Sequence, residues 1–112
     1  MTTHSPLATK KCKDCGADAK ALPPETIADL IKQIPGWDLV EGEVRRTFKF
    51  KNYYETLAFV NATAWISHHE NHHPDMEVGY NKVTMRYSTH SVKGLTENDF
   101  ICPAKISELL KA

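Results

Sequence analysis

The sequence has little of several features, and each shortage excludes a class of protein. Only three of its 112 residues are cysteines, and so small and odd a number argues against a disulfide framework. Its 14 basic residues are balanced by 14 acidic ones, so no net field favours nucleic acid or an anionic membrane. No apolar run approaches a membrane span, and the polar N-terminus lacks the apolar core of a signal peptide. We therefore expect a cytoplasmic protein with neither a nucleic-acid nor a membrane partner.

The length of the chain suits one domain with a core of its own and is too short for two. Residues 1–22 are polar and rich in lysine, and Pro23-Pro24 closes them, which predicts a flexible N-terminal leader. Residues 23–112 are predicted to form the single domain.

Two of the three cysteines, Cys12 and Cys15, form a CxxC motif within the expected leader, while Cys102 stands alone. A zinc ribbon needs a second CxxC, and a redox motif of the thioredoxin type follows a strand and opens a helix. Neither context is present in the sequence. We therefore expect Cys12 and Cys15 to be reduced thiols in a tail.

The spacing of apolar residues predicts three helices and two β-hairpins. The expected elements, in order, are a helix over 27–34, strands over 37–40 and 44–50, a helix over 53–71, strands over 76–80 and 83–87, and a helix from 96 onward. Two hairpins make a four-stranded antiparallel sheet, and three helices packed on one face complete an α+β fold.

Some side chains of these elements are expected to face the core. On the second helix the expected apolar face is Leu57, Ala58, Ala62, Trp65 and Ile66, and on the last helix it is Ile106, Leu109 and Leu110. Tyr80 is expected to be a core position of its strand, since it alternates with polar neighbours.

Four of the six histidines lie in the segment His68-His69-Glu70-Asn71-His72-His73-Pro74. Imidazole changes its charge near neutral pH and is also the commonest metal ligand. Such a cluster therefore has three interpretations: a metal site, a solvated helix end or a centre for proton transfer.

The metal interpretation rests on His69-Glu70-x-x-His73, which matches the HExxH pattern of zinc-dependent hydrolases. Pro74 ends the helix directly after the second ligand, however, because proline cannot continue a helix. The helix-end interpretation suits His68 and His69 best, since a histidine cation is favourable at the negative end of the helix dipole.

The proton-transfer interpretation depends on residues further along the chain. If the second helix ends beside the strand over 83–88, then His72, His73 and His90 converge on one pocket. Asp99, at the start of the last helix, can orient one of them or bind the ligand. It also fits as a capping residue of that helix.

These residues resemble the pterin-4a-carbinolamine dehydratase family. The resemblance covers roughly residues 23–110, and the family's four-stranded antiparallel sheet with three helices on one side agrees with the predicted elements. The residues that carry it are His68, His72-His73-Pro74, Tyr80-Asn81-Lys82-Val83, Ser88-Thr89-His90, Gly94-Leu95 and Asp99.

The resemblance implies an enzyme that dehydrates 4a-hydroxytetrahydropterin to quinonoid dihydropterin and water by histidine acid–base catalysis. No cofactor and no metal is required, because the reaction is a net loss of water. The implied catalytic residues are His72, His73 and His90, and the implied substrate-binding residues are Pro74, Ser88, Thr89 and Asp99.

The resemblance also implies partners. A homodimer or homotetramer is expected, and so is a role in tetrahydrobiopterin recycling for an aromatic amino acid hydroxylase such as phenylalanine hydroxylase; a molybdopterin-related role fits the same residues. Animal members of the family also bind a homeodomain transcription factor. Nothing in this sequence indicates that partner. The alternatives to a dehydratase are a zinc-dependent hydrolase that uses His69-Glu70-x-x-His73, and a non-catalytic dimerisation or transcriptional cofactor.

Overall fold

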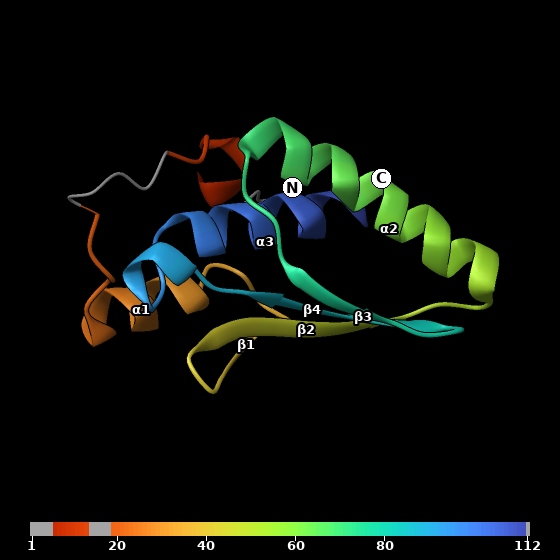
Figure 1. Cartoon of the computed structure of the whole chain (residues 1–112), viewed down its shortest axis with the longest axis horizontal. Helices are drawn as coiled ribbons and strands as arrows, with labels where there is room; N and C mark the ends of the chain where they lie inside the picture. The colour runs from red at the N-terminus through yellow and green to blue at the C-terminus, as the bar shows by residue number, and fades with distance from the viewer. Residues whose placement is uncertain (1–5, 14–18, 112) are drawn as a thin grey trace.

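Four strands form one antiparallel sheet in the order β1-β2-β4-β3, and the α-helices lie on one side of it (Figure 1). The structure is a computed structural model that describes residues 6–13 and 19–111. Within those ranges the three α-helices and the sheet confirm the predicted α+β fold class. In chain order the elements are η1 (Pro6–Thr9), α1 (Pro24–Ile31), β1 (Asp38–Val40), β2 (Glu43–Lys49), α2 (Tyr53–Glu70), β3 (Asp75–Val78), β4 (Lys82–Tyr87), η2 (His90–Val92) and α3 (Asn98–Leu109).

The first hairpin turns at Glu41-Gly42, where the sequence predicts it. Both residues have positive φ, 51° and 76°, as a two-residue turn of the type that matches strand twist requires. The second hairpin has a longer turn, because the last pair is Val78 with Val83 and Gly79 N–H donates to the carbonyl of Lys82 at 2.8 Å. Tyr80 therefore lies in the turn and is 67% exposed, so its predicted core position is wrong.

The core lies between the sheet and α3. On β4 the alternate residues Val83, Met85 and Tyr87 are fully buried, as the two-residue period of a strand predicts. Ile106 of α3 is buried as expected, but Leu109 and Leu110 are exposed at 36% and 43%. Leu109 is the last residue of the helix and Leu110 is its C-cap, so the predicted apolar stripe is wrong at these two positions.

The buried face of α2 differs from the predicted one. The residues buried along the helix are Thr56, Phe59 and Thr63, whereas Trp65 is 65% exposed. Apolar side chains surround this helix, so their spacing does not select one face. The threonines are accommodated because their hydroxyls bond to main-chain carbonyls, that of Thr63 to Val60 at 2.8 Å.

The described part of the expected leader packs on the domain. Leu7 in η1 is only 1% exposed and belongs to the hydrophobic core. The ammonium group of Lys105 on α3 donates to the carbonyl of Ala8 at 2.9 Å. The expectation of a separate leader therefore does not hold for residues 6–13, because a buried leucine and hydrogen bonds to α3 anchor this segment.

No helix within the described ranges is both long and apolar enough to cross a membrane.

Replacing Leu7 tests whether this segment stabilises the fold. Leu7→Ala should lower the free energy of unfolding by about 2–4 kcal/mol, because it removes a buried side chain and leaves a cavity. Leu110→Ala is the matched control, since Leu110 is 43% exposed and its loss should cost less than about 1 kcal/mol. Urea unfolding measures both, and equal effects of the two changes would contradict the packing of η1.

Candidate active site

The site begins where α2 ends. Asn71 adopts the left-handed conformation, with φ 51° and ψ 42°, which asparagine tolerates better than most residues. The N–H of His72 then donates to the carbonyl of Ser67 at 3.2 Å, closing the last turn. The chain leaves the helix axis at this point, so His72 is directed toward the start of α3 instead of continuing around the helix.

His72 is held on two sides by side chains from other elements. Its Nε2 lies 2.6 Å from Oδ1 of Asp99, and its ring stacks on that of Tyr87, with centroids 5.8 Å apart and planes 18° from parallel. The Asp99 side chain is fully buried and that of His72 is 12% exposed. Burial raises the pKa of Tyr87 well above its usual value, so the stacked phenol stays neutral.

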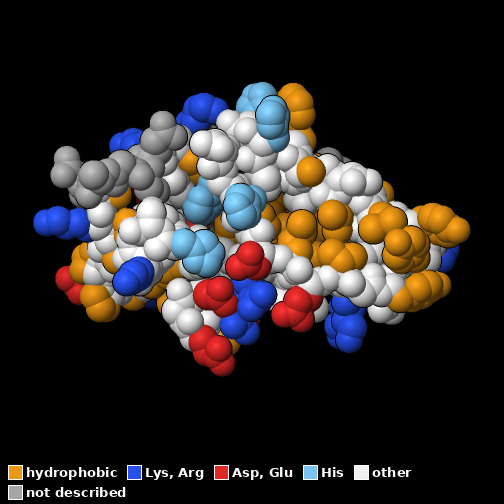
Figure 2. All heavy atoms as spheres, in the orientation of Figure 1, with side chains coloured by type: hydrophobic (Ala, Val, Ile, Leu, Met, Phe, Trp, Pro, Cys, Tyr) orange, Lys and Arg blue, Asp and Glu red, His pale blue; other side chains and the backbone are white. Residues whose placement is uncertain are grey.

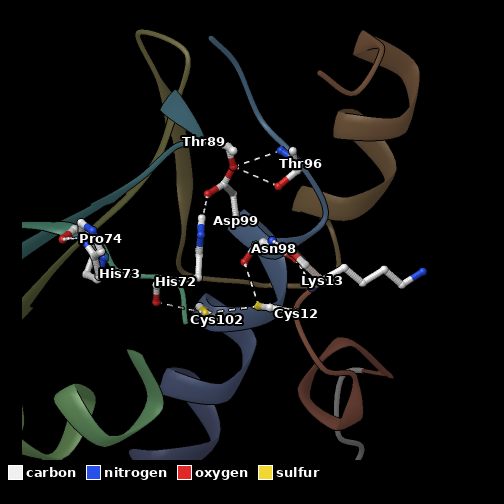
Figure 3. Close-up of polar contacts among 10 residues, drawn as sticks. All are labelled: Cys12, Lys13, His72, His73, Pro74, Thr89, Thr96, Asn98, Asp99 and Cys102. Atoms are coloured by element: carbon white, nitrogen blue, oxygen red, sulfur yellow. Dashed lines mark hydrogen bonds and ion pairs between the residues drawn. The ribbon is translucent and has the colours of Figure 1, made fainter. Parts of the chain in front are cut away.

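Asp99 has donors for both of its carboxylate oxygens (Figure 3). Oδ1 faces His72, while Oδ2 accepts from the Thr89 hydroxyl at 2.7 Å and from the Thr96 N–H at 3.0 Å. The position in the first turn of α3 also places the negative charge at the positive end of the helix dipole. One carboxylate thus caps the helix and orients His72, so both interpretations of its position apply together.

This contact sets the tautomer of His72. An ionised carboxylate only accepts hydrogen bonds, so Nε2 of His72 carries the proton. In the neutral ring Nδ1 is then the acceptor, and none of the hydrogen bonds among the described residues uses it.

A cavity of about 430 Å³ opens beside His72. Figure 2 shows several histidine side chains on one face of the molecule. The cavity is lined by Lys13, Asn71, His72, His73, Ser88, Thr89, His90, Ser91 and Asn98. The structure therefore brings together the three histidines that the sequence singles out, together with Ser88 and Thr89.

Two of the residues that the sequence assigns to substrate binding, Asp99 and Pro74, do not lie on the cavity surface. Both are buried. Asp99 sits behind His72, so its contact with the cavity is made through the imidazole ring. Pro74 carries the chain from the end of α2 into β3.

His73 and His90 are exposed at the edge of the cavity. Nδ1 of His73 lies 3.3 Å from the carbonyl of Pro74, so it donates there and leaves Nε2 as the acceptor. His90 begins η2 inside a closed turn, because the Thr89 N–H donates to Gly94 at 2.8 Å and bridges the two ends.

Sequence reasoning missed the part of the wall made by Lys13 and Asn98. The amide of Asn98 receives the Lys13 N–H at 3.0 Å and donates back to the Lys13 carbonyl at 2.8 Å. The Lys13 side chain points away from His72 (Figure 3). No local pattern predicts this contact, which joins residues 85 positions apart.

The HExxH string does not form a joint site. The helix ends at Glu70, so His73 is not on the same helical face as His69. The His69 ring packs on Trp65, with centroids 4.6 Å apart. Glu70 is only 7% exposed and accepts from the N–H of Cys12 at 2.8 Å. These three residues thus contact three different parts of the chain.

Residues 20–109 match the sequence profile of the family described as pterin 4 alpha carbinolamine dehydratase. The chain belongs to this family. A protein of Nitrosospira multiformis named "Putative pterin-4-alpha-carbinolamine dehydratase" is 54% identical over 110 residues, which are 98% of this chain and 97% of the relative. A protein of the same name from Stenotrophomonas maltophilia is 54% identical over 111 residues, 97% of this chain and 96% of that protein.

Solved structures share the fold. A transcriptional coactivator/pterin dehydratase from Brucella melitensis superposes with a TM-score of 0.76 at 27% identity, over 80% of this chain and 98% of that one. A pterin dehydratase-like protein, described as a RuBisCO assembly factor in the alpha-carboxysome, has a TM-score of 0.54 at 22% identity over 65% of this chain and 84% of that one. The second likeness concerns the fold alone. Family membership and the names of the relatives point to pterin carbinolamine dehydratase activity.

Removing one donor to Asp99 tests the buried network. Thr89→Val keeps the shape but leaves Oδ2 of the carboxylate with one donor fewer, so the free energy of unfolding should fall by about 1–3 kcal/mol. Thr47→Val is the matched control, because the Thr47 hydroxyl pairs with that of Thr84 on an exposed surface. That change should cost less than about 0.5 kcal/mol, and equal losses in chemical denaturation would contradict the network.

Proposed function

We propose that this protein dehydrates 4a-hydroxytetrahydropterin to quinonoid dihydropterin and water, with His72, His73 and His90 as the catalytic residues. The observation that carries the proposal is the set of three histidines on one cavity, one of them held by a buried carboxylate. Membership of the dehydratase family supports the same reaction.

The reaction needs two proton transfers. Hydroxide leaves C4a poorly unless an acid protonates it, and the proton on N5 needs a base. Histidine suits both tasks because its ordinary pKa lies near neutral pH, and each such transfer is typically worth roughly 10²–10⁴-fold in rate. As the bond from C4a to the hydroxyl breaks, the electron pair of the N5–H bond becomes the second bond of C4a=N5. The elimination is neither an oxidation nor a reduction, so the proposal includes no redox cofactor.

The geometry suggests how the histidines divide these tasks. Because Asp99 holds the proton on Nε2 of His72, the remaining acceptor Nδ1 suits the base that receives the N5 proton. His73 and His90 are exposed, and in the imidazolium form either ring has a proton to give to the leaving hydroxide. Asp99 then acts as a positioning residue and not as a substrate contact.

Ser88 and Thr89 take different parts in this proposal. The N–H and carbonyl of Thr89 are both bonded within the turn that ends at Gly94, and its hydroxyl bonds to Asp99. Thr89 therefore shapes the site through Asp99. Ser88 follows the last paired residue of β4, so we assign to it the pairing with the amide-like edge of the pterin.

Alanine replacements of the cavity histidines test the proposal. His72→Ala, His73→Ala and His90→Ala should each lower the dehydration rate by roughly 10²–10⁴-fold, measured by stopped flow with freshly generated 4a-hydroxytetrahydropterin. His68→Ala and His69→Ala are controls, because both residues are exposed and neither lines the cavity. Near-wild-type rates in a folded His72 or His90 variant would defeat the assignment.

We place the reaction in tetrahydrobiopterin recycling in the cytoplasm, as the partner of an aromatic amino acid hydroxylase. A hydroxylase releases the 4a-hydroxy compound, and reduction back to tetrahydropterin requires its dehydration. Adding this protein to a coupled hydroxylase assay should remove any lag in the formation of quinonoid dihydropterin, and an unchanged lag would contradict the link.

We also propose that the protein is a homo-oligomer that pairs through β3. Met76 and Val78 lie opposite the fully buried Met85 and Val83, so they share the helix-covered face of the sheet, yet they are 39% and 46% exposed. Figure 2 shows several groups of apolar side chains from the centre of the view to its right end. β3 is the last strand in the sheet order, so its outer edge can pair with a second copy, and exposed apolar residues beside it favour such an interface.

Charge at the β3 edge tests the oligomer. Val78→Lys should shift the sedimenting species toward monomer in analytical ultracentrifugation, because it places an ammonium group in the proposed interface. Leu39→Lys makes the same kind of change on the opposite edge strand, at a residue that is 43% exposed, and should leave the assembly intact. A monomeric wild type, or disruption by Leu39→Lys alone, would contradict pairing through β3.

A further inference from the structure

Two cysteines that are far apart in the sequence lie side by side behind the histidine cavity. The sulfur atoms of Cys12 and Cys102 are 3.6 Å apart although 90 positions separate the residues. Cys12 follows η1, and Cys102 lies on α3. The expectation that Cys102 stands alone is therefore wrong, as is that of a tail thiol for Cys12. Cys15, the other half of the CxxC motif, lies outside the described residues.

The approach of the two thiols is fixed by bonds on both sides of Cys12. The Cys12 N–H donates to Glu70 at 2.8 Å, and the neighbouring Lys13 is joined to the Asn98 amide by two hydrogen bonds. Glu70 and Asn98 belong to α2 and α3, whose positions the core determines. Cys12 is thus held against Cys102 by contacts that do not involve sulfur.

The two thiols differ in how far solvent and reagents can reach them. Cys102 is fully buried, and its hydrogen bond with Cys12, together with burial, raises its pKa above the usual value. Cys12 is half-buried, so it is the thiol that a reagent meets first. This is the arrangement of an attacking cysteine with a resolving cysteine next to it.

We propose that Cys12 and Cys102 are a redox-active pair that closes into an intramolecular disulfide when a small-molecule disulfide is the oxidant. The Cys12 thiolate attacks one sulfur of the oxidant, which releases one small thiol and leaves a mixed disulfide on Cys12. The Cys102 sulfur loses its proton and attacks Cys12, which releases the second thiol. The protein loses two hydrogens and the oxidant gains them. The sulfurs must move from 3.6 Å to an S–S bond length of roughly 2.0 Å.

The disulfide would act on the wall of the histidine cavity. The Cys102 thiol donates a weak hydrogen bond to the carbonyl of His72 at 3.8 Å, and oxidation removes this donor. The disulfide also links the N-terminal segment covalently to α3. Lys13 of that segment and Asn98 of α3 both line the cavity. Figure 3 shows the two sulfurs on the opposite side of His72 from Thr89 and Thr96. The inference concerns the thiols alone and does not depend on the proposed reaction.

Peptide mapping tests which cysteines join. The full chain is equilibrated with oxidised glutathione, free thiols are alkylated, and the protein is cut with trypsin. Cleavage after Lys13 separates the two N-terminal cysteines, so the three cysteines fall in fragments 12–13, 14–20 and 94–105. We expect a disulfide between fragments 12–13 and 94–105. A link between 12–13 and 14–20, a mixed disulfide on Cys12 that persists, or three alkylated thiols would each overturn the proposal.

Single replacements give a second readout. Oxidation should raise the Tm of the wild type by at least roughly 10 °C, because the bond closes a loop of 90 residues. Cys15→Ser should keep this rise, whereas Cys12→Ser should abolish it while changing only a half-buried side chain. Cys102→Ser should also abolish it, but that residue is buried, so Cys12→Ser decides the outcome. A rise that survives in Cys12→Ser would contradict the pair.

Discussion

The arrangement of this molecule depends on one buried carboxylate. Asp99 is fully buried, and an ionised group in that position is stable only when charge-assisted hydrogen bonds replace its water. Its donors come from three separate places: His72 after α2, Thr89 after β4 and Thr96 before α3. The end of a helix, the end of a strand and the start of another helix must therefore meet, and the cavity lies where they do.

Some residues around this carboxylate hold His72 in place, and others face the cavity. Asp99 and the Thr89 hydroxyl orient His72, while His73 and His90 remain exposed beside it. Glu70 is part of a string that looks like a zinc motif, yet it anchors the N-terminal segment through Cys12. That segment completes the wall with Lys13 and brings a thiol to Cys102. A chain of this size thus uses its N-terminal residues as part of the site.

The fold alone would leave the function open. A protein with the same fold at 22% identity is described as a RuBisCO assembly factor, and one fold commonly carries several functions. Two relatives at 54% identity, aligned over nearly their whole length, carry the name "Putative pterin-4-alpha-carbinolamine dehydratase", and the residues proposed to carry the reaction are the three histidines on the cavity. The site therefore carries the functional conclusion.

The sequence by itself determined the α+β fold class and the histidines worth testing. It also determined the Glu41-Gly42 turn and the ends of α2, because turns and helix ends depend on neighbours along the chain. Only the tertiary structure decided which face of α2 is buried, since apolar residues surround that helix. It also decided the burial of Leu7, the position of Asp99 behind His72 and the approach of Cys12 to Cys102. The last two contacts join residues 27 and 90 positions apart. Such contacts arise from packing between elements, and no local pattern encodes them.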